Sequence, residues 1–403
     1  MTRASPWIDA AHACRLLGVS RNTLYAYVSR GFVHSQPSPR SPRERTYARP
    51  DVERLLQRTE QRRAPDRAAA RALNWGMPVL ESSMTLIDGR RLYYRGHDAT
   101  LLARSRSLEE VAALLWTGSF AMTRPPGTVV ASPRPDRRLP YVARAEVLLA
   151  TAAARDRLAV DLRAPGVVRT GLQIVQLLTR AATLREQPLA PADAALARTW
   201  KLAAGPAAIV RAALVLCADH ELNVSSFTAR CVASSGSHPY AVVLAGLAAL
   251  EGPKHGGAGA RVESMLESMR RARQLRAVVE ARLRRGELLE GFGHPLYPDG
   301  DPRARALLEM LGETAARSAE YRFTMDFARE ATAITGDHPN LDYALASVGR
   351  VLDLPRGAPL MLFAIGRSVG WVGHAIEQYA TGQLIRPRAK YAGQPPSAGD
   401  APR

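Results

Sequence analysis

The chain has 403 residues, of which 46% are hydrophobic and 23% charged, a composition that suits a large buried core and excludes a disordered or fibrous chain. No apolar run approaches the roughly 20 residues that a bilayer-spanning helix needs, and the N-terminus lacks the apolar stretch of a secretory signal. The three cysteines, Cys14, Cys217 and Cys231, form neither a disulfide framework nor a metal motif. We therefore expect a reduced, cytoplasmic protein of two or three domains with no membrane partner.

The formal net charge is +18, and arginine supplies nearly all of the cations. The first 72 residues hold 14 arginines and six acidic residues, a net charge of +8, whereas the other 331 residues carry +10. This denser charge at the front favours a polyanionic partner for that segment. A general preference for arginine codons explains the overall bias equally well.

Residues 1–63 show the pattern of a helix-turn-helix domain with a wing. Residues 8–17 predict a helix with apolar positions at spacings of three, followed by a turn at Gly18 and a second helix over 21–30. A Pro/Ser/Arg loop comes next, and a third helix starts at Pro50. The segment AHACRLLGVSRNTLYAYVSRG, with RTYARPDVERLL after it, resembles the MerR and excisionase-like DNA-binding modules.

This resemblance makes the second helix a recognition helix that binds DNA through Arg21, Asn22 and Tyr25, near its exposed N-terminal turns. Three further arginines line the expected wing: Arg40, Arg43 and Arg45. The alternative is a degenerate module that acts as a protein contact or a spacer. Residues 64–72 predict an Arg/Ala-rich linker to the rest of the chain.

From residue 73 onward the pattern is helical almost throughout, with long Ala/Leu/Val/Arg segments interrupted by Gly and Pro. The pair Asp88-Gly89 between apolar flanks predicts one small hairpin. The Pro-rich residues 123–140 predict a surface loop. These patterns indicate a mainly α-helical domain of the size of an enzyme.

Several common kinds of catalytic site are excluded by their missing motifs. None of the nine histidines lies in an HExxH zinc-binding helix or accompanies a GxSxG nucleophile turn. The phosphate loop GxxxxGKS/T is absent, which excludes P-loop nucleotide chemistry. The glycine-rich string GPKHGGAGARVE follows no predicted strand and lacks the GxGxxG spacing of a dinucleotide site.

Six segments instead set reactive polar residues among Gly and Pro. They are ADHELNVSSFTAR (His220), EGPKHGGAGARVESML (His255), GFGHPLYPDGDPRARAL (His294 and Arg303), HPNLDYALASVGRVLDLP (Asp342), GRSVGWVGHAIEQ (Arg367) and IRPRAKYAG (Arg386 and Arg388). A histidine at a glycine-lined helix start stays neutral and can donate a hydrogen bond to a developing oxyanion. Several arginines suit a substrate with more than one carboxylate. The set indicates carbanion chemistry on an acidic substrate.

In order and spacing these segments resemble the citrate synthase family over about residues 73–403, and the early stretch ESSMTLIDGRRLYYRGHDATLLARSRSLEEVAALLWTG does so too. The resemblance implies an all-α, two-domain fold and a homodimer with a shared active site. A large domain would comprise 73–257 and 365–403, and a small domain, 258–364, would close over the substrate. No metal and no permanently bound cofactor is expected, because acetyl-CoA acts as a substrate.

The resemblance also implies a role for each matched residue. Asp342 removes a proton from the methyl group of acetyl-CoA, while His255 hydrogen-bonds the thioester oxygen. His294 polarises the ketone of oxaloacetate and protonates the new alkoxide. The substrate carboxylates are bound by His220, Arg303, Arg367 and Arg386, the last from the partner subunit. Hydrolysis of citryl-CoA to citrate and CoA completes the reaction, which is that of the tricarboxylic acid cycle.

Three features depart from the family pattern: Gly259 where many members have Asn, the Pro-rich residues 120–140, and the additional front module. Two alternatives to acetyl-CoA condensation follow. A 2-methylcitrate synthase would use propionyl-CoA, and one methylene changes binding in a pocket by only about 1–3 kcal/mol. A DNA-binding regulator would use the helical domain as a ligand sensor, but a sensor has no need of the base Asp342.

Overall fold

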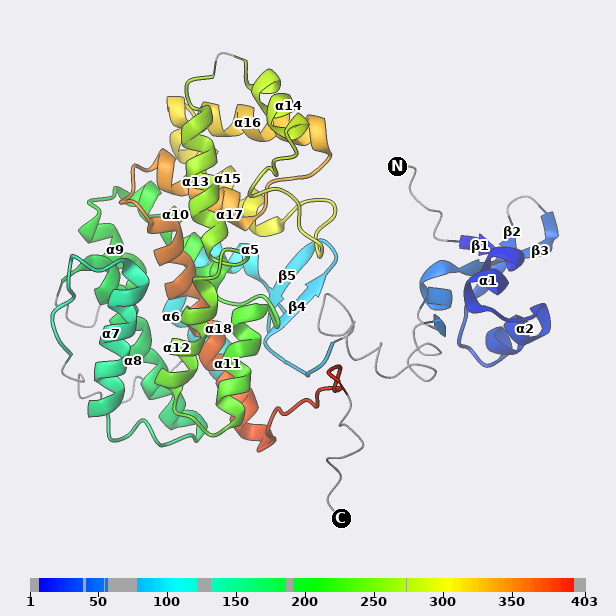
Figure 1. Ribbon diagram of the computed structural model, residues 1–403, viewed down its shortest axis with the longest axis horizontal. Helices are drawn as coiled ribbons and strands as arrows, with labels where there is room; N and C mark the ends of the chain where they lie inside the picture. Colours follow the sequence, from blue (N-terminus) through cyan, green and yellow to red (C-terminus); the bar gives the residue numbers. More distant parts are fainter. Residues whose placement is uncertain are drawn as a thin grey trace. The chain divides into compact units, whose positions relative to one another are not determined.

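The chain folds into two compact units, Met1–Glu81 and Ser82–Arg403, which we call the front module and the body. The computed structural model (Figure 1) describes residues 7–38, 41–53, 55–56, 78–121, 132–185, 191–272 and 274–394. The expected linker, residues 64–72, lies outside these ranges, as does part of the Pro-rich segment. Residues 132–140, the described part of that segment, contain no helix or strand, in agreement with the predicted loop.

The front module combines two helices with a three-stranded antiparallel sheet in the order β1-β3-β2. Its elements are β1 (Trp7–Asp9), α1 (Ala10–Leu17), α2 (Arg21–Ser29), β2 (Ser35–Ser38) and β3 (Ser41–Ala48). The predicted first helix was wrong by two residues, because Ile8 pairs with Tyr47 in the sheet and Asp9 caps the helix by accepting the His12 N–H at 2.7 Å. The Pro/Ser/Arg loop forms two paired strands, β2 and β3.

A small apolar core of its own holds the front module together. Leu24 of α2 is fully buried against Leu17 of α1, and Tyr47 of β3 belongs to the same cluster. Gly18 makes the turn between the helices with φ of 64°, a left-handed conformation that favours glycine. Ser20 caps α2 by accepting the Thr23 N–H. The chain is helical again from Arg49, as the sequence predicts to within one residue.

The body is mostly helical over its described residues. One small antiparallel sheet, in the order β4-β5-β6, comprises β4 (Thr85–Asp88), β5 (Arg91–Tyr94) and β6 (His97–Asp98). The register pairs Asp88 with Arg91, so the hairpin predicted at Asp88-Gly89 is confirmed.

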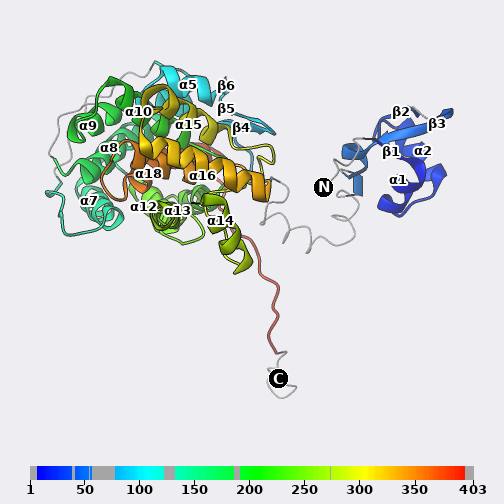
Figure 2. The same cartoon turned by 90° about the horizontal axis from the view of Figure 1, so that it is seen from above.

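The helices of the body pack as a bundle that is seen from two directions in Figures 1 and 2. They are α5 (Ala99–Ser105), α6 (Leu108–Thr117), α7 (Tyr141–Arg155), α8 (Ala164–Thr183), α9 (Ala192–Thr199), α10 (Ala204–Cys217), α11 (Val224–Ser234), α12 (Pro239–Leu250), α13 (Gly257–Met269), α14 (Leu275–Arg284), α15 (Pro302–Ala315), α16 (Ala319–Thr335), α17 (Leu341–Val351) and α18 (Ala358–Thr381). None of the described helices is long and apolar enough to cross a bilayer.

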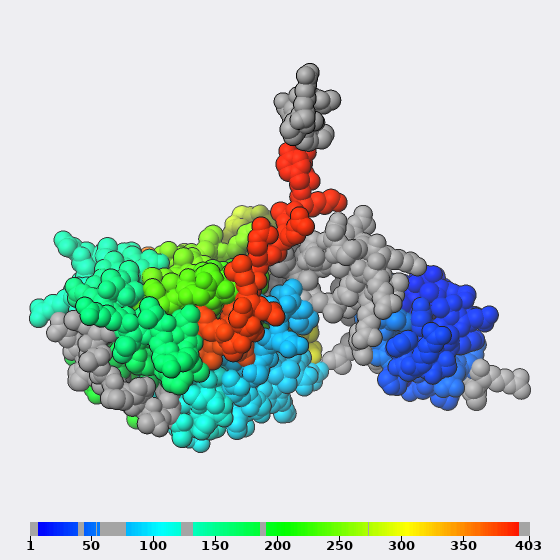
Figure 3. All heavy atoms as spheres, turned by 90° about the horizontal axis from the view of Figure 1, so that it is seen from below, coloured from blue at the N-terminus to red at the C-terminus, as the bar shows by residue number. Residues whose placement is uncertain are grey.

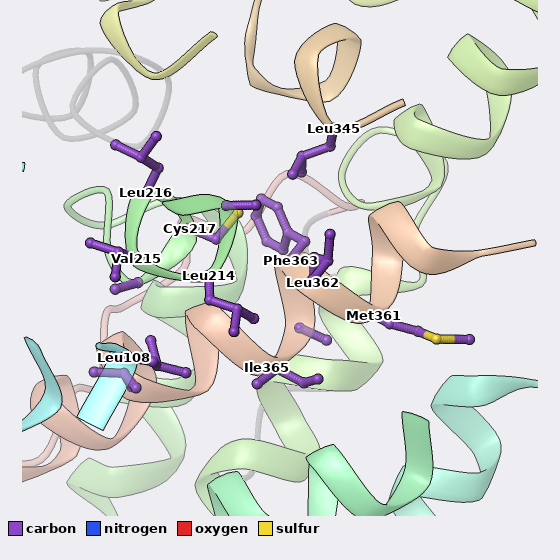
Figure 4. Close-up of a cluster of buried hydrophobic side chains, with 14 of the residues drawn as sticks. Leu108, Leu214, Val215, Leu216, Cys217, Leu345, Met361, Leu362, Phe363 and Ile365 are labelled. Atoms are coloured by element: carbon purple, nitrogen blue, oxygen red, sulfur yellow. The ribbon is translucent and has the colours of Figure 1, made fainter. Parts of the chain in front are cut away.

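The 24-residue helix α18 runs through the middle of the body and packs against α6, α8, α10, α11 and α12. Figure 4 shows part of the resulting apolar core, to which α10 contributes Leu214 and Cys217, α17 Leu345, and α18 Leu362 and Phe363. Gly370 lets the helix approach the Ala218 carbonyl so closely that a Cβ there would collide with it. The predicted domain boundary at 364/365 falls inside α18, and the division into a large and a small domain stays a prediction.

After α18 the chain leaves the body as an exposed segment, residues 382–394, which we call the C-terminal arm. Figure 3 shows it standing out from the packed helices. The arm contains no helix or strand, and its residues are exposed except for the partly buried Ile385. Leu384 and Tyr391 are exposed by 61% and 76%, respectively.

Candidate active site

His220 lies in the turn between α10 and α11, and the sheet of the body holds this turn in place. Thr85 of β4 donates a hydrogen bond to the Asp219 carboxylate at 2.6 Å, and the Tyr94 hydroxyl accepts the Asp219 N–H at 3.3 Å. The His220 side chain is buried, and its Nε2 lies 3.0 Å from the Tyr297 hydroxyl. Burial, followed by the charges of Arg303 and Arg367, holds the pKa of His220 well below its usual value.

His294 approaches His220 from the loop before α15. The two rings are 5.2 Å apart, and the His294 ring is 5.1 Å from that of Tyr297. The His294 Nδ1 accepts the Leu296 N–H at 3.2 Å, so a neutral ring carries its proton on Nε2. Burial and then Arg303 lower the pKa of His294 to about 4. The expected neutrality therefore has another cause, because this histidine lies in a loop and not at a helix start.

Arg303 is fully buried at the start of α15, where it forms a bidentate ion pair with Asp301. The Arg303 Nε and Nη2 groups lie 3.0 and 2.8 Å from the two carboxylate oxygens. The same carboxylate accepts the Leu341 N–H at 3.1 Å. Asp301 thus neutralises Arg303 and ties it to the first turn of α17, which carries Asp342.

Asp342 is the second residue of α17, and its side chain is partly exposed. The cap residue Asn340 accepts the Asp342 N–H at 3.0 Å and donates to the Gly293 carbonyl at 3.1 Å, which joins this helix start to the His294 loop. Burial raises the pKa of Asp342 to about 6, although the nearby Arg303 opposes this shift. At neutral pH the group is a carboxylate that is more basic than an ordinary aspartate.

His255 lies in the turn that leads into α13. Its Nε2 is 2.8 Å from the Ser225 hydroxyl, which also accepts the Trp371 indole N–H at 3.2 Å. The ring of Phe363 packs edge-on against it at 5.7 Å. Burial and then Arg367 lower the pKa of His255 to about 4. The ring is neutral across the physiological range, here too mainly because of burial.

Arg367 of α18 is completely buried and only partly satisfied. Its Nε donates to the Cys217 carbonyl at 2.8 Å, and its guanidinium lies 4.8 Å from the Phe363 ring centre. The Nη1 atom is buried and has no hydrogen-bond partner among the described residues. A buried guanidinium with an unsatisfied N–H is costly. A bound carboxylate would satisfy it.

Among the residues predicted to bind substrate or to catalyse the reaction, Arg386 is the one that no hydrogen bond, ion pair or ring contact of the described structure joins to the others. It lies on the C-terminal arm with its side chain exposed. No hydrogen bond or ion pair of Arg386 occurs within the described ranges. Arg388, two residues further along, is also exposed.

Three residues of the site were missed by the sequence reasoning: Ser225, Tyr297 and Asp301. Asp301 could have been found, because it directly precedes Arg303 in the string DPR and a carboxylate beside a buried arginine is expected to pair with it. Ser225 and Tyr297 gave no local signal. Each contacts a histidine that is far away in the sequence, His255 and His220 respectively.

The sequence and the fold are similar to those of known proteins. The family model for the C-terminal domain of citrate synthase matches residues 72–140 and 172–388. The putative citrate synthase 2 of Mycobacterium tuberculosis (strain H37Rv) is 31% identical over 335 residues, which cover 78% of this chain and 90% of that protein. Citrate synthase 2 of Bacillus subtilis is 39% identical over 184 residues, so the chain spans about half the length of that relative.

A solved structure shares the fold of the body. It is a ternary complex of citrate synthase from Thermoplasma acidophilum with carboxymethyl coenzyme A and oxaloacetate. Its TM-score is 0.64 and its identity 25%, over 80% of this chain and 95% of that one. The family model matches most of the body, and the M. tuberculosis relative is matched over 90% of its own length. The chain therefore belongs to the citrate synthase family of acyltransferases.

Proposed function

We propose that the chain condenses acetyl-CoA with oxaloacetate and hydrolyses the resulting citryl-CoA to citrate and CoA. One observation carries this proposal. Three partly exposed groups that can exchange protons, His255, His294 and Asp342, are connected to two fully buried guanidinium groups. The Phe363 ring contacts both His255 and Arg367. The Tyr297 ring contacts both His294 and Arg303. Asp301 pairs with Arg303 and accepts the N–H of Leu341, the residue before Asp342.

The first step is removal of a proton from the methyl carbon of acetyl-CoA. The Asp342 carboxylate takes this proton, and its pKa of about 6 makes it a better base than a solvated aspartate. His255 donates a hydrogen bond from Nδ1 to the thioester oxygen, where negative charge develops. This requires its Nε2 to accept the Ser225 hydroxyl proton, which must then turn away from the Asn223 side-chain oxygen 3.0 Å from that hydroxyl. The Trp371 N–H occupies one lone pair of that hydroxyl and so helps to orient it.

The enol carbon then attacks the ketone of oxaloacetate. His294 carries its proton on Nε2, because its Nδ1 accepts from the backbone. It polarises the ketone and delivers that proton to the alkoxide. Arg367, Arg303 and His220 bind the carboxylates, and the Nη1 of Arg367 is a buried, charged donor with no partner among the described residues. Water then adds to the thioester carbonyl and releases the CoA thiol.

We further propose a homodimer in which Arg386 completes the partner's site. The exposed Arg386 supports this, as do the exposed Leu384 and Tyr391 of the same arm. Arg303 is already paired with Asp301, so within the candidate site Arg367 is the guanidinium without a carboxylate partner among the described residues. Two substrate carboxylates call for a second one. A cytoplasmic location and closure of residues 258–364 over the substrates belong to the same proposal.

A thiol-release assay tests the proposed reaction. The purified chain should release CoA from acetyl-CoA only when oxaloacetate is present. The 2-methylcitrate alternative is tested in the same assay, where propionyl-CoA would give the higher kcat/KM. If neither thioester is consumed while oxaloacetate still binds, the body is a ligand sensor and the proposal of catalysis is wrong.

A second proposed function is binding of duplex DNA by residues 1–63. Arg21, Asn22 and Tyr25 are exposed on α2, while Leu24 on its other side is fully buried. The hairpin of β2 and β3 follows in the chain, where the wing is expected. Of the predicted wing arginines, Arg45 is exposed, and its Nε donates to the Ser35 hydroxyl at 3.0 Å. Arg40 lies outside the described residues.

A further inference from the structure

The C-terminal end of α18 carries a buried polar cluster that the proposed mechanism does not use. Arg230 of α11 is buried and lies between two residues of α18. Its Nε donates to the Gln378 side-chain oxygen at 2.8 Å, and its Nη1 donates to the Glu377 carboxylate at 3.2 Å. We call these three residues the arm anchor. A buried arginine needs such partners, because removing either leaves a charged donor unsatisfied.

The arm anchor holds the first residues of the C-terminal arm. The Gln378 amide nitrogen donates to the Gln383 carbonyl at 2.7 Å and to the Thr381 hydroxyl at 3.2 Å. Gly382, with φ of 62°, turns the chain at the end of the helix. Gln378 therefore connects Arg230 inside the body to a backbone carbonyl only three residues before Arg386.

The two helices that carry the anchor also begin at, or pass through, the candidate active site. Ser225, in the first turn of α11, contacts His255, and Arg230 follows on the same helix. Arg367 and Gln378 are both on α18, roughly 16 Å apart along its axis at 1.5 Å per residue. The anchor is thus rigidly placed relative to the residues that would bind substrate.

The remaining carboxylate oxygen of Glu377 fixes the anchor from a third side. It accepts the backbone N–H and the hydroxyl of Ser83, at 2.8 and 2.9 Å. Glu377 is only slightly exposed, whereas Ser83 lies at the surface. With β4 beginning two residues after Ser83, three separate segments of the body meet where the arm departs.

We infer that Arg230, Glu377 and Gln378 are positioning residues that fix the direction in which the arm leaves the body, so that Arg386 is presented in one orientation to the partner subunit. This inference rests on the proposed function of Arg386. Without the anchor, an arm of exposed residues would sample many directions, and binding would have to restrict it at an entropic cost.

The sharpest test is Gln378→Glu. The change keeps the shape and the oxygen that accepts from Arg230, but it replaces the donor to the Gln383 carbonyl by a repelling oxygen. The dissociation constant of oxaloacetate, measured by calorimetry, should rise about tenfold, the effect of one lost hydrogen bond to a well-placed group. The matched control is Gln383→Ala, because the anchor uses only the backbone carbonyl of Gln383 and its side chain is exposed.

A double-mutant cycle shows whether the effect passes through Arg386. In an Arg386→Ala background, Gln378→Glu should weaken oxaloacetate binding no further. The same loss in both backgrounds would overturn the inference. Turnover by the wild type is measured separately, and its absence would refute only the proposed function. Amide hydrogen exchange over residues 382–388 then still tests the anchor, since exchange should accelerate in Gln378→Glu and unchanged exchange would rule the anchor out.

Discussion

The front module and the body use arginine in opposite environments. The arginines proposed to bind DNA in the module, such as Arg21 and Arg45, are exposed and lie on one helix or one hairpin. The body arginines Arg230, Arg303 and Arg367 are nearly or fully buried. Arg230 and Arg367 bond segments distant in the chain, whereas Arg303 pairs with Asp301, whose carboxylate accepts the distant Leu341 N–H.

This difference separates two kinds of anion recognition. An exposed guanidinium binds a polyanion through many weak contacts that salt screens. A buried one is already oriented and desolvated, so it can hold one small carboxylate in a fixed geometry. The body also neutralises one of its arginines, Arg303, with Asp301 and leaves Arg367 only partly satisfied. The predictions below test whether this separation holds.

The largest expected effect is the loss of the base. Asp342→Asn keeps the shape of the side chain but cannot accept a proton, so kcat should fall by at least about 10²-fold. The dissociation constant of oxaloacetate should change little, because the arginines are untouched. Turnover close to that of the wild type would show that Asp342 is not the base.

The next largest effect concerns Arg386, the exposed arginine of the proposed shared site. Arg386→Ala should nearly abolish activity, and dimers re-formed from Arg386→Ala and Asp342→Asn subunits should regain up to about half the activity of one normal pair of sites. In such a dimer one composite site receives both defects and the other neither. Mixed dimers as inactive as their parents would place Arg386 in its own subunit's site.

The pH dependence of kcat/KM tests whether burial in the body sets the pKa of Asp342. The carboxyl of Asp342 must be ionised to accept a proton, and burial raises its pKa to about 6. We therefore expect kcat/KM for acetyl-CoA to be constant above this pH and to fall towards tenfold per unit below it. The pKa values of His255 and His294 are about 4, so these rings stay neutral in this range. Following the thioester absorbance directly avoids the pH dependence of thiol reagents. If kcat/KM began to fall only below pH 5, Asp342 would not be the group whose ionisation controls the reaction.

Salt should distinguish the two kinds of arginine most directly. Raising NaCl from 50 to 200 mM should weaken duplex binding by the full-length chain at least tenfold, while the oxaloacetate dissociation constant changes less than about twofold. Arg21→Ala should weaken binding to a selected duplex more than binding to a random one. If the chain has no DNA affinity even at low salt, the module is a protein contact or a spacer.

The smallest expected effect concerns a residue that acts through His220. Tyr297→Phe leaves the buried Nε2 of His220 without its hydroxyl partner, at a cost of about 1 kcal/mol. KM for oxaloacetate should rise roughly fivefold, with kcat less affected. A larger loss in kcat than in affinity would show that the hydroxyl takes part in the chemical steps.

Local rules were sufficient for much of the fold. The hairpin at Asp88-Gly89 and the turn at Gly18 follow from backbone preferences of single residues. The strand at residues 7–9 was missed, because Ile8 is also compatible with a helix and only its pairing with Tyr47, 39 positions later, decides. For the site, the order of the motifs indicated the chemical class, and the comparisons support the family.

The sequence by itself determined which groups are available for chemistry: two histidines and one aspartate set among glycines, and several arginines. The tertiary structure decided their state. Ser225 meets His255, Asp301 pairs with Arg303 and caps the α17 backbone, and Arg367 bonds a carbonyl 150 positions away. Such contacts depend on how helices pack, which no local pattern specifies. Burial then set the pKa values of His255, His294 and Asp342, because the cost of charge depends on the water excluded by those packed helices.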